Sequence, residues 1–188
     1  MHTVSVDNVY SGLDGERLAF LQCLAGLQGF ALSSTISDVA LVHLRHLPRL
    51  QELSLRGRSD TGLVHLEGLT ELKFLDLSGS LSHLVSGSFG SGILDAGLAN
   101  LRHVPGLQDL SLRGRKISDA GFVHLEGLRG LQSLDLSGTD ITDTRLVHVG
   151  GLNRLQHLNL SHTRVSSSGV DYINRALPNC VISRNINR

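Results

Sequence analysis

The sequence repeats itself at a spacing near 24 residues. The stretch at 107–128 (LQDLSLRGRKISDAGFVHLEGL) nearly duplicates the one at 50–69 (LQELSLRGRSDTGLVHLEGL), and milder copies fill the rest of the 188-residue chain. A repeat of this length predicts a solenoid in which each unit forms one turn. Solenoids present a broad, ordered face that usually binds a large partner, whereas enzymes usually need a deep pocket that excludes water.

Each unit has two halves that differ in the spacing of their apolar residues. The first half reads L-x-x-L-x-L, and apolar residues two positions apart predict a strand with one face inward. These segments begin at Leu27, Leu50, Leu72, Leu107, Leu131 and Leu155. The second half has apolar residues three positions apart, which predicts a tight helical turn or a short helix. These segments begin at Leu18, Leu41, Leu63, Leu98, Phe122 and Leu146.

A single unit is too small to fold alone. It supplies about seven buried side chains worth roughly 1.5–3 kcal/mol each, whereas ordering its backbone costs roughly 1–2 kcal/mol per residue. We therefore expect an α/β fold in which the turns stack and bury one another's faces. Their strands should pair in parallel, with right-handed crossovers between them.

The segment from Leu131 to Leu152 (LQSLDLSGTDITDTRLVHVGGL) resembles the leucine-rich repeat unit LxxLDLSGTxITDxGLxxLxxL. It is most similar to the cysteine-containing-like class, with Thr where many relatives carry Asn or Cys. The resemblance extends over nearly the whole chain. It implies a curved solenoid with a parallel sheet on the concave face and short helices on the convex face. It also implies a protein-interaction module, without indicating the partner.

The repeats predict one leucine-rich repeat domain over residues 1–188. We expect an N-terminal capping turn at 1–26, six or so repeats at 27–176 and a C-terminal cap at 177–188. Residues 4–6 and 180–182 are predicted to form the first and last strands. A larger protein that contains this chain stays an open alternative, because related repeats often lie beside other domains.

Two neighbouring turns depart from the period. Leu50 and Leu72 are 22 residues apart, whereas Leu72 and Leu107 are 35 apart, which is 11 more than the period of 24. The extra residues form an insertion near 81–91 that is rich in Gly and Ser. It is interpreted either as a protruding binding loop or as a neutral excursion whose apolar groups pack on the neighbouring turn. The candidate contact residues in this loop are Leu84, Val85 and Phe89.

Charge and hydropathy argue against several classes of partner. Lys plus Arg and Asp plus Glu both number 17, so the formal net charge is zero. This balance argues against nucleic acid or an anionic membrane as the main partner, since both attract a basic surface. The chain lacks an apolar run of about 18 residues, so we expect no membrane span. Its first residues also lack the pattern of a signal peptide.

Cys23 and Cys180 lie at opposite ends of the predicted stack. Six turns at about 4.8 Å per strand would place them nearly 30 Å apart, whereas a disulfide needs Cα atoms within about 7 Å. We therefore expect two unpaired thiols that act as apolar filling in a reducing compartment. This favours a cytoplasmic location, although an exported effector without a cleaved signal would have the same features.

A column of acidic residues precedes the helical segments, three positions before the first apolar residue. Its members are Asp38, Asp60, Asp95, Asp119 and Asp143, with Ser167 in the last full turn. Paired carboxylates can perform acid–base chemistry, but Asp at this place is also a preferred helix N-cap. We predict helix capping for the column. We also expect the glycines two residues later to permit close approach to the next turn.

Residues that flank the strand leucines should point away from the core and form columns on the exposed face of the sheet. Phe74 lies among polar and charged residues in these columns. An aromatic side chain in such surroundings is typical of an interface anchor. The predicted partner-binding residues are Glu52, Arg56, Phe74, Asp76, Asp109, Arg113, Asp135, His157 and Asn159.

Phe74 has a second interpretation. The insertion near 81–91 starts in the same turn and could shield the ring. The nearby charges would then only neutralise one another, at under about 1 kcal/mol per exposed pair. Of the two interpretations, we favour the partner site.

Histidines recur on the outer face. His43, His65, His124 and His148 occupy equivalent positions, and stacked histidines can bind a metal ion. Asn100 interrupts the column and no cysteine joins it, so the sequence does not contain a closed ligand set. We therefore predict solvated helix positions and neither a metal nor a cofactor.

Arginines replace the loop Thr or Asn of the resembled repeat in two turns. Arg58 and Arg115 stand where other turns carry Thr139 and Thr163, and they extend a basic edge that includes Lys116. This edge could meet an acidic partner or form a solvated rim, and we favour the rim.

The sequence as a whole predicts a monomeric, non-enzymatic module that binds a protein on its concave face. The alternative is the substrate-recognition part of a larger protein, such as a ubiquitin-ligase adaptor or a secreted bacterial effector. An enzyme is disfavoured because the Ser, His and Asp residues lie at repeat positions that have structural explanations.

Overall fold

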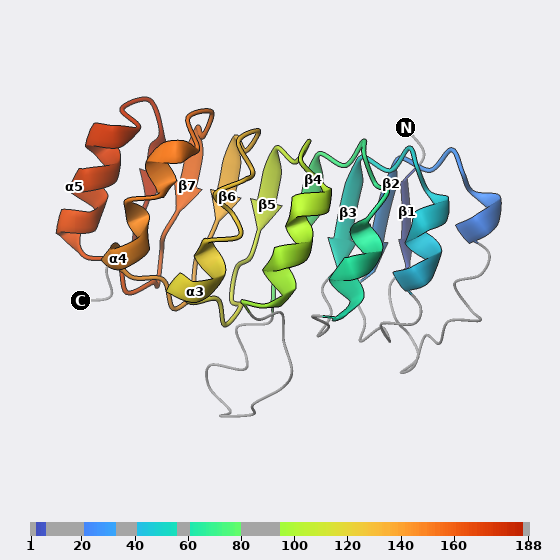
Figure 1. Ribbon diagram of the computed structural model, residues 1–188, viewed down its shortest axis with the longest axis horizontal. Coiled ribbons are helices and arrows are strands. Elements are labelled where there is room, and N and C mark those ends of the chain that lie inside the picture. The colour runs from blue at the N-terminus through green and yellow to red at the C-terminus, as the bar shows by residue number, and fades with distance from the viewer. Residues whose placement is uncertain (1–2, 7–20, 33–40, 56–60, 80–94, 186–188) are drawn as a thin grey trace.

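The computed structural model describes residues 3–6, 21–32, 41–55, 61–79 and 95–185. Its strands form one eight-stranded sheet in which every neighbouring pair is parallel and the spatial order follows the chain (Figure 1). The strands are β1 (Thr3–Val6), β2 (Gly29–Leu32), β3 (Glu52–Leu55), β4 (Phe74–Asp76), β5 (Asp109–Ser111), β6 (Ser133–Asp135), β7 (His157–Asn159) and β8 (Val181–Ser183). Strands are thus present where the sequence predicted the first and last ones.

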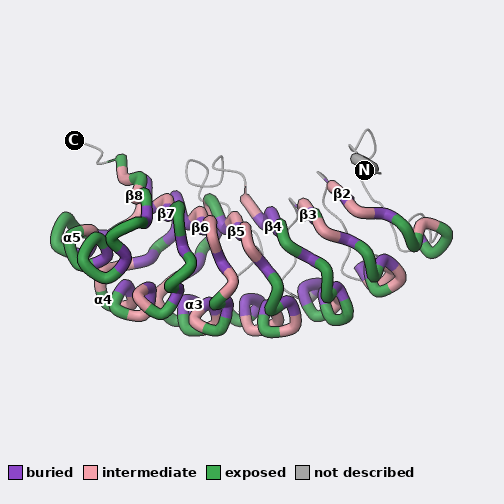
Figure 2. The backbone as a smooth tube through the Cα atoms, turned by 90° about the horizontal axis from the view of Figure 1, so that it is seen from above, coloured by how far each residue is buried: buried purple, intermediate pink, exposed green. Residues whose placement is uncertain are grey.

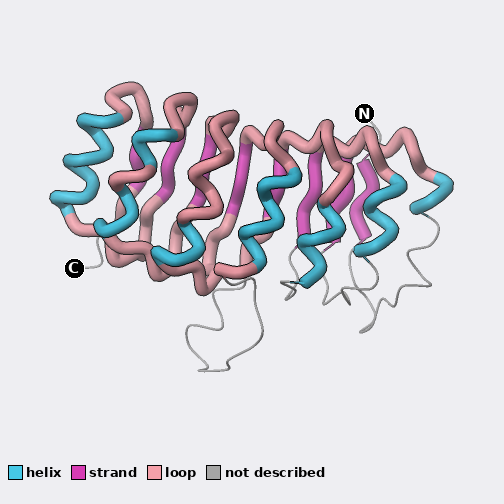
Figure 3. Tube along the Cα trace, in the orientation of Figure 1, coloured by secondary structure: helices cyan, strands magenta, loops and turns pink. Residues whose placement is uncertain are grey.

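Short helices return the chain from one strand to the next (Figure 3). Four of the described helices are 3₁₀ helices, as expected from apolar residues three positions apart. These are η2 (Val42–His46), η3 (Thr61–Leu66), η4 (Gly97–His103) and η5 (Val149–Gly151). The α-helices are α3 (Asp119–Phe122), α4 (Asp143–Leu146) and α5 (Ser167–Ala176).

The stack is curved, with the strands along the concave side and the helices along the convex side (Figure 2). Strands in a sheet are about 4.7–4.9 Å apart, whereas packed helices need about 8–10 Å. The helical side of each turn is therefore wider than the strand side, and the stack bends toward the strands. The predicted fold class is confirmed.

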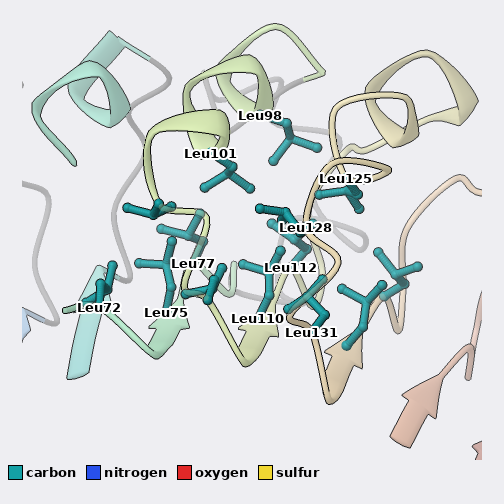
Figure 4. Packing of buried hydrophobic residues seen from close by; sticks show 14 of the residues in the cluster. Leu72, Leu75, Leu77, Leu98, Leu101, Leu110, Leu112, Leu125, Leu128 and Leu131 are labelled. Carbon is teal, nitrogen blue, oxygen red and sulfur yellow. The ribbon is translucent and has the colours of Figure 1, made fainter. Parts of the chain in front are cut away.

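Leucines from both halves of each turn fill the space between the sheet and the helices (Figure 4). Leu75 and Leu110 point inward from strands and are 0% and 2% exposed, while Leu98 and Leu125 face them from the helical side at 0%. The irregular spacing of the repeats leaves the sheet register intact, because Leu75 still pairs with Leu53 and Leu110. The length differences are therefore confined to the connections. The insertion near 81–91 lies outside the described residues.

The predicted capping role of the aspartates is wrong. The N-caps of α3, α4 and α5 are Ser118, Thr142 and Ser166, each one residue before the column position that the sequence predicted to cap. Asp119 instead accepts hydrogen bonds from the Thr142 backbone N–H and hydroxyl, at 3.0 and 2.6 Å, and so joins one turn to the next. Asp95 binds Ser118 in the same way. Asp38 and Asp60 lie outside the described residues.

The third bridge of this kind joins Asp143 to Ser166. Two glycines leave room for the bridging carboxylates. A Cβ at Gly121 would lie 2.3 Å from Oδ1 of Asp95, and one at Gly169 would lie 2.3 Å from Oδ1 of Asp143. The predicted approach to the next turn is therefore wrong at these two glycines, which instead lie close to a side chain of the preceding turn.

The two cysteines have different surroundings. Cys23 and Cys180 are both free, but Cys23 is exposed and Cys180 is buried. The prediction of apolar filling is therefore wrong for Cys23. Burial raises the pKa of the Cys180 thiol above its usual value, because the thiolate loses hydration. In the described part of the chain, no helix is long and apolar enough to cross a membrane.

Candidate partner-binding surface

One row of outward-pointing side chains crosses the concave sheet. Parallel pairing aligns Glu52 with Phe74, Phe74 with Asp109, and Asp109 with Ser133. The row continues through His157 to Val181. An inward leucine directly follows each of the strand positions from Glu52 to His157, so these side chains lie on the solvent face.

Val181 is a surface residue that the sequence reasoning missed. It is 60% exposed, which is the largest value among the exposed large apolar side chains of the described residues. Its strand was expected, and extending the sheet register by one strand would have added it to the row that contains Phe74. The row therefore carries an apolar residue near its middle and another at its C-terminal end.

A shallow hollow surrounds Phe74. It has a volume of about 330 Å³ and is lined by Gln51, Glu52, Lys73, Phe74 and Asp109. Phe74 is 41% exposed, so much of its ring is open at the hollow. The sequence predicted Glu52, Phe74 and Asp109 as neighbours but did not identify Lys73, which precedes the strand. The loop residues Leu84, Val85 and Phe89 lie outside the described residues.

A second row lies two residues further along the strands and contains Asp76, Asp135 and Asn159. Its side chains accept hydrogen bonds from nearby groups of the protein. Oδ1 of Asp76 accepts a hydrogen bond of 2.9 Å from the backbone N–H of Ser78, and Oδ2 accepts one of 3.2 Å from the Ser54 hydroxyl. Asp76 is only 7% exposed, so the expectation that it stands open on the concave face is wrong. Its predicted contact with a partner is untested.

Asp135 and Asn159 repeat this arrangement. Each accepts a hydrogen bond from a backbone N–H two residues later, that of Ser137 at 2.8 Å and that of Ser161 at 3.1 Å. Both remain partly accessible. These side chains therefore shape the ends of the strands, and any partner would meet their remaining acceptor atoms.

Arg113 is exposed beyond the end of β5, whereas Arg115 is buried. The Arg115 guanidinium donates through Nη2 to the Ser78 carbonyl at 3.0 Å and through Nε to the Leu77 carbonyl, both in the preceding turn. The prediction of a solvated rim is therefore wrong at Arg115. Arg56 and Arg58 lie outside the described residues.

The convex side carries the histidine column and a set of exposed valines. His148 and Glu126 lie 3.2 Å apart across neighbouring turns, at a second hollow of about 400 Å³. Among the described residues, no group of three His, Cys, Asp or Glu side chains could hold a metal ion. Val64, Val123 and Val147 are 44–50% exposed on this side. They precede the histidines in the repeat, and sequence reasoning passed over them.

The repeats that form this surface also match a known protein family. Residues 105–165 match the family model described as leucine rich repeat. The chain has the leucine-rich repeat fold. Its placement in the cysteine-containing-like class stays a prediction. No curated protein matches the chain.

Solved structures with the same leucine-rich repeat fold include two internalins from Listeria monocytogenes. An internalin C2 is 23% identical with a TM-score of 0.64, and the match covers 89% of this chain and 67% of that one. An internalin of the inlF type is 16% identical with a TM-score of 0.55, and the match covers 98% of this chain and 59% of the other. Both likenesses concern the fold. The repeat family supports a protein-interaction module at this general level.

Proposed function

We propose that this leucine-rich repeat protein is a non-enzymatic recognition module whose concave sheet binds a protein partner around Phe74. The observation that carries the proposal is the 41% exposure of an aromatic ring in a hollow on an ordered sheet. Aromatic side chains supply much of the energy of protein interfaces, particularly where neighbouring residues exclude water around them. The accessible side chains on either side of Phe74 in the same row give a partner a broad surface to contact.

A binding role accounts for the polar residues better than an enzymatic role. Asp95, Asp119 and Asp143 are engaged in bridges to hydroxyls of the next turn, so they serve the stack. The hollow at Phe74 is open to solvent, whereas catalysis is favoured in sites that exclude water. We also propose a cytoplasmic location, from the unpaired thiols.

A second candidate is the substrate-recognition part of a larger protein, such as a ubiquitin-ligase adaptor or a secreted bacterial effector. The observation in its favour is length, because the match spans only 67% and 59% of the two internalin chains. In this case the same surface would select the substrate, and other segments would supply the activity.

The test is capture of proteins from a native lysate by the full chain, followed by titration of each captured protein. Replacing Phe74 with Ala should weaken the partner by roughly tenfold or more, since aromatic anchors are typical hot spots, and Arg113→Glu should weaken it as well. Val147→Ala is the matched control, because Val147 is an exposed apolar residue on the convex side. All variants should keep the unfolding midpoint of the native chain. Equal affinity for wild type and Phe74→Ala would reject this surface.

A further inference from the structure

We propose that the partner inserts an arginine side chain into the hollow at Phe74, between the carboxylates of Glu52 and Asp109. This inference rests on the proposed function and gives the chemistry of the partner. It follows from the position of two uncommitted acidic groups on either side of one exposed aromatic ring.

The sheet register fixes the relative positions of the three side chains. Glu52 and Phe74 are paired residues on β3 and β4, and Phe74 and Asp109 are paired residues on β4 and β5. Paired residues on adjacent strands lie about 4.8 Å apart and point to the same face. One carboxylate therefore flanks the ring on each side, and all three residues line the same hollow of about 330 Å³.

The two carboxylates are not neutralised by the rest of the described chain. Glu52 is exposed and Asp109 is partly exposed. Neither has an ion pair or a side-chain hydrogen bond with any other residue that the structure describes. Asp76, by contrast, is committed to Ser54 and Ser78. The acidic groups beside Phe74 are thus available to a cation from outside the chain.

An arginine side chain matches this arrangement best. A cation over an aromatic face is attracted by the ring quadrupole, and arginine is the residue found most often in such contacts. The guanidinium is planar, it is more weakly hydrated than an ammonium group, and its five N–H donors can bind carboxylates in pairs. It can therefore stack on the Phe74 ring while donating toward Glu52 on one side and Asp109 on the other.

Lys73 can be used to test whether the ligand of the hollow is positively charged. Its exposed side chain also lines the hollow, and within the described part of the chain no ion pair joins it to Glu52 or Asp109. An ammonium group near the hollow repels an incoming guanidinium. Removing it in Lys73→Gln should therefore raise the affinity for an arginine ligand, and the same change should lower the affinity for an acidic one.

The experiment selects random peptides displayed on phage against the full chain and discards those that also bind Phe74→Ala. The retained peptides are synthesised in matched forms, with each arginine replaced in turn by citrulline, which has nearly the same shape without the charge, or by lysine. Affinities are measured by calorimetry at low and high salt, with wild type, Lys73→Gln and the double variant Glu52→Gln/Asp109→Asn. Val147→Ala serves as the control variant.

We expect the retained peptides to share an arginine whose replacement by citrulline weakens binding by roughly tenfold or more, as for a buried, charged anchor. The double variant should weaken the arginine peptide to a similar extent and leave the citrulline peptide nearly unchanged. Lys73→Gln should tighten the arginine peptide, and added salt should weaken it.

Three results would overturn the proposal. Retained peptides without a basic residue would reject the arginine-binding site, and so would an arginine that citrulline replaces without loss of affinity. Either result would leave recognition around Phe74 intact. Equal affinity of the lysine form would reject the choice of arginine. If every peptide that binds the wild type also bound Phe74→Ala equally well, both the arginine-binding site and the proposed function would be rejected.

Discussion

A single carboxylate in each of three successive turns performs two tasks. Oδ1 of Asp119 accepts the backbone N–H of Thr142, and Oδ2 accepts the Thr142 hydroxyl. That hydroxyl in turn accepts a 3.2 Å hydrogen bond from the backbone N–H of Thr144, one of the free donors at the start of α4. The aspartate thus orients the cap of the next turn's helix, so the register of one turn is passed to the next through side chains.

Removing this bridge should destabilise the whole chain. In Asp119→Ala, the Thr142 hydroxyl and N–H lose a charged acceptor in a partly buried place. Hydrogen bonds to charged groups contribute about 1.5–3 kcal/mol, so we expect the free energy of unfolding to fall by about 2–3 kcal/mol. Urea denaturation followed by circular dichroism measures this change.

Asp140→Ala is the matched control for Asp119→Ala. Asp140 pairs with Arg164 at 3.0 Å, but the two side chains are 51% and 73% exposed. Exposed ion pairs contribute about 0–1 kcal/mol, so this variant should stay close to wild type. If the two alanine variants were equally stable, the bridge would have no part in holding the turns together.

The two thiols should react at different rates. Cys23 is exposed, whereas Cys180 is buried, and its raised pKa leaves less of the reactive thiolate at any given pH. We expect a thiol reagent to label Cys23 first. Labelling of Cys180 in the folded protein should become fast only at a higher pH than an ordinary thiol requires. Time courses with Cys23→Ser and Cys180→Ser assign the phases. A fast Cys180 phase near neutral pH would contradict the assignment.

The sequence predicted individual positions well where the leucine spacing alone decides them. Leu53, Leu75 and Leu110 are aligned and buried as expected. The aspartates were misassigned as caps because Asp is a good N-cap and lies three residues before the first apolar residue of each helical segment. In the structure, Asp119 is the first residue of α3 and the cap precedes it. Their true partners lie 23 residues away, as for Asp119 and Thr142. Such contacts depend on how two turns stack, which local spacing does not show.

At the scale of the element, the described loops after β5, β6 and β7 close in one of two ways. Thr139 and Thr163 donate their hydroxyls to carbonyls within their own loops, at 2.6 and 2.7 Å. Arg115 occupies the equivalent position but reaches back to Leu77 and Ser78 of the preceding turn. Gly79 permits this close approach of the two loops, because a Cβ there would lie 2.9 Å from the Gly114 carbonyl oxygen and 3.2 Å from Cδ of Arg115.

The arginine therefore fastens the loop that leaves β4 just before the insertion. Arg115→Met keeps much of the side-chain volume but removes the donors, which leaves the Leu77 and Ser78 carbonyls without this partner. Loss of a buried hydrogen-bond partner costs about 1–3 kcal/mol. We expect the free energy of unfolding to fall by about 2 kcal/mol in urea denaturation.

Two further variants test whether the loss of stability in Arg115→Met comes from the missing hydrogen-bond donors. Arg115→Thr can restore the local hydrogen bond seen at Thr139, so it should be more stable than Arg115→Met. Arg113→Met changes an exposed arginine two residues away and should cost little. A loss in Arg113→Met as large as that in Arg115→Met would show that net charge matters here and that the carbonyl contacts do not.

At the scale of the whole molecule, the repeat period determined the architecture and much of the candidate surface. The fold follows from stacking identical leucine patterns, and the row from Glu52 to Asp109 follows from the same register. Burial of Asp76 and Arg115 could not be predicted in this way. It arises where a strand end meets the loop of an adjacent turn, and the 22- and 35-residue spacings made those loops irregular.

The stack should tolerate the loss of one complete turn. Residues 131–154 form one period of 24, and their removal joins Gly130 to Leu155 with the leucine register preserved. Asp119 would then face Ser166, which already binds Asp143 through the same two donors that Thr142 uses. We expect this variant to fold with the same ratio of strand to helix and with lower stability, because neighbouring turns stabilise one another.

Urea denaturation tests this prediction through two quantities. These are the midpoint of the unfolding transition and the slope of the free energy of unfolding against urea concentration. The slope scales with the surface that unfolding exposes, so it should fall by roughly one eighth, in proportion to the residues removed. The unfolding transition should stay cooperative. Deleting only residues 131–142 is the control, because it brings a helical segment where a strand must pair and leaves Asp119 without Thr142. If the half-turn deletion unfolded as cooperatively as the full-turn deletion, stability would not depend on the matching of successive turns.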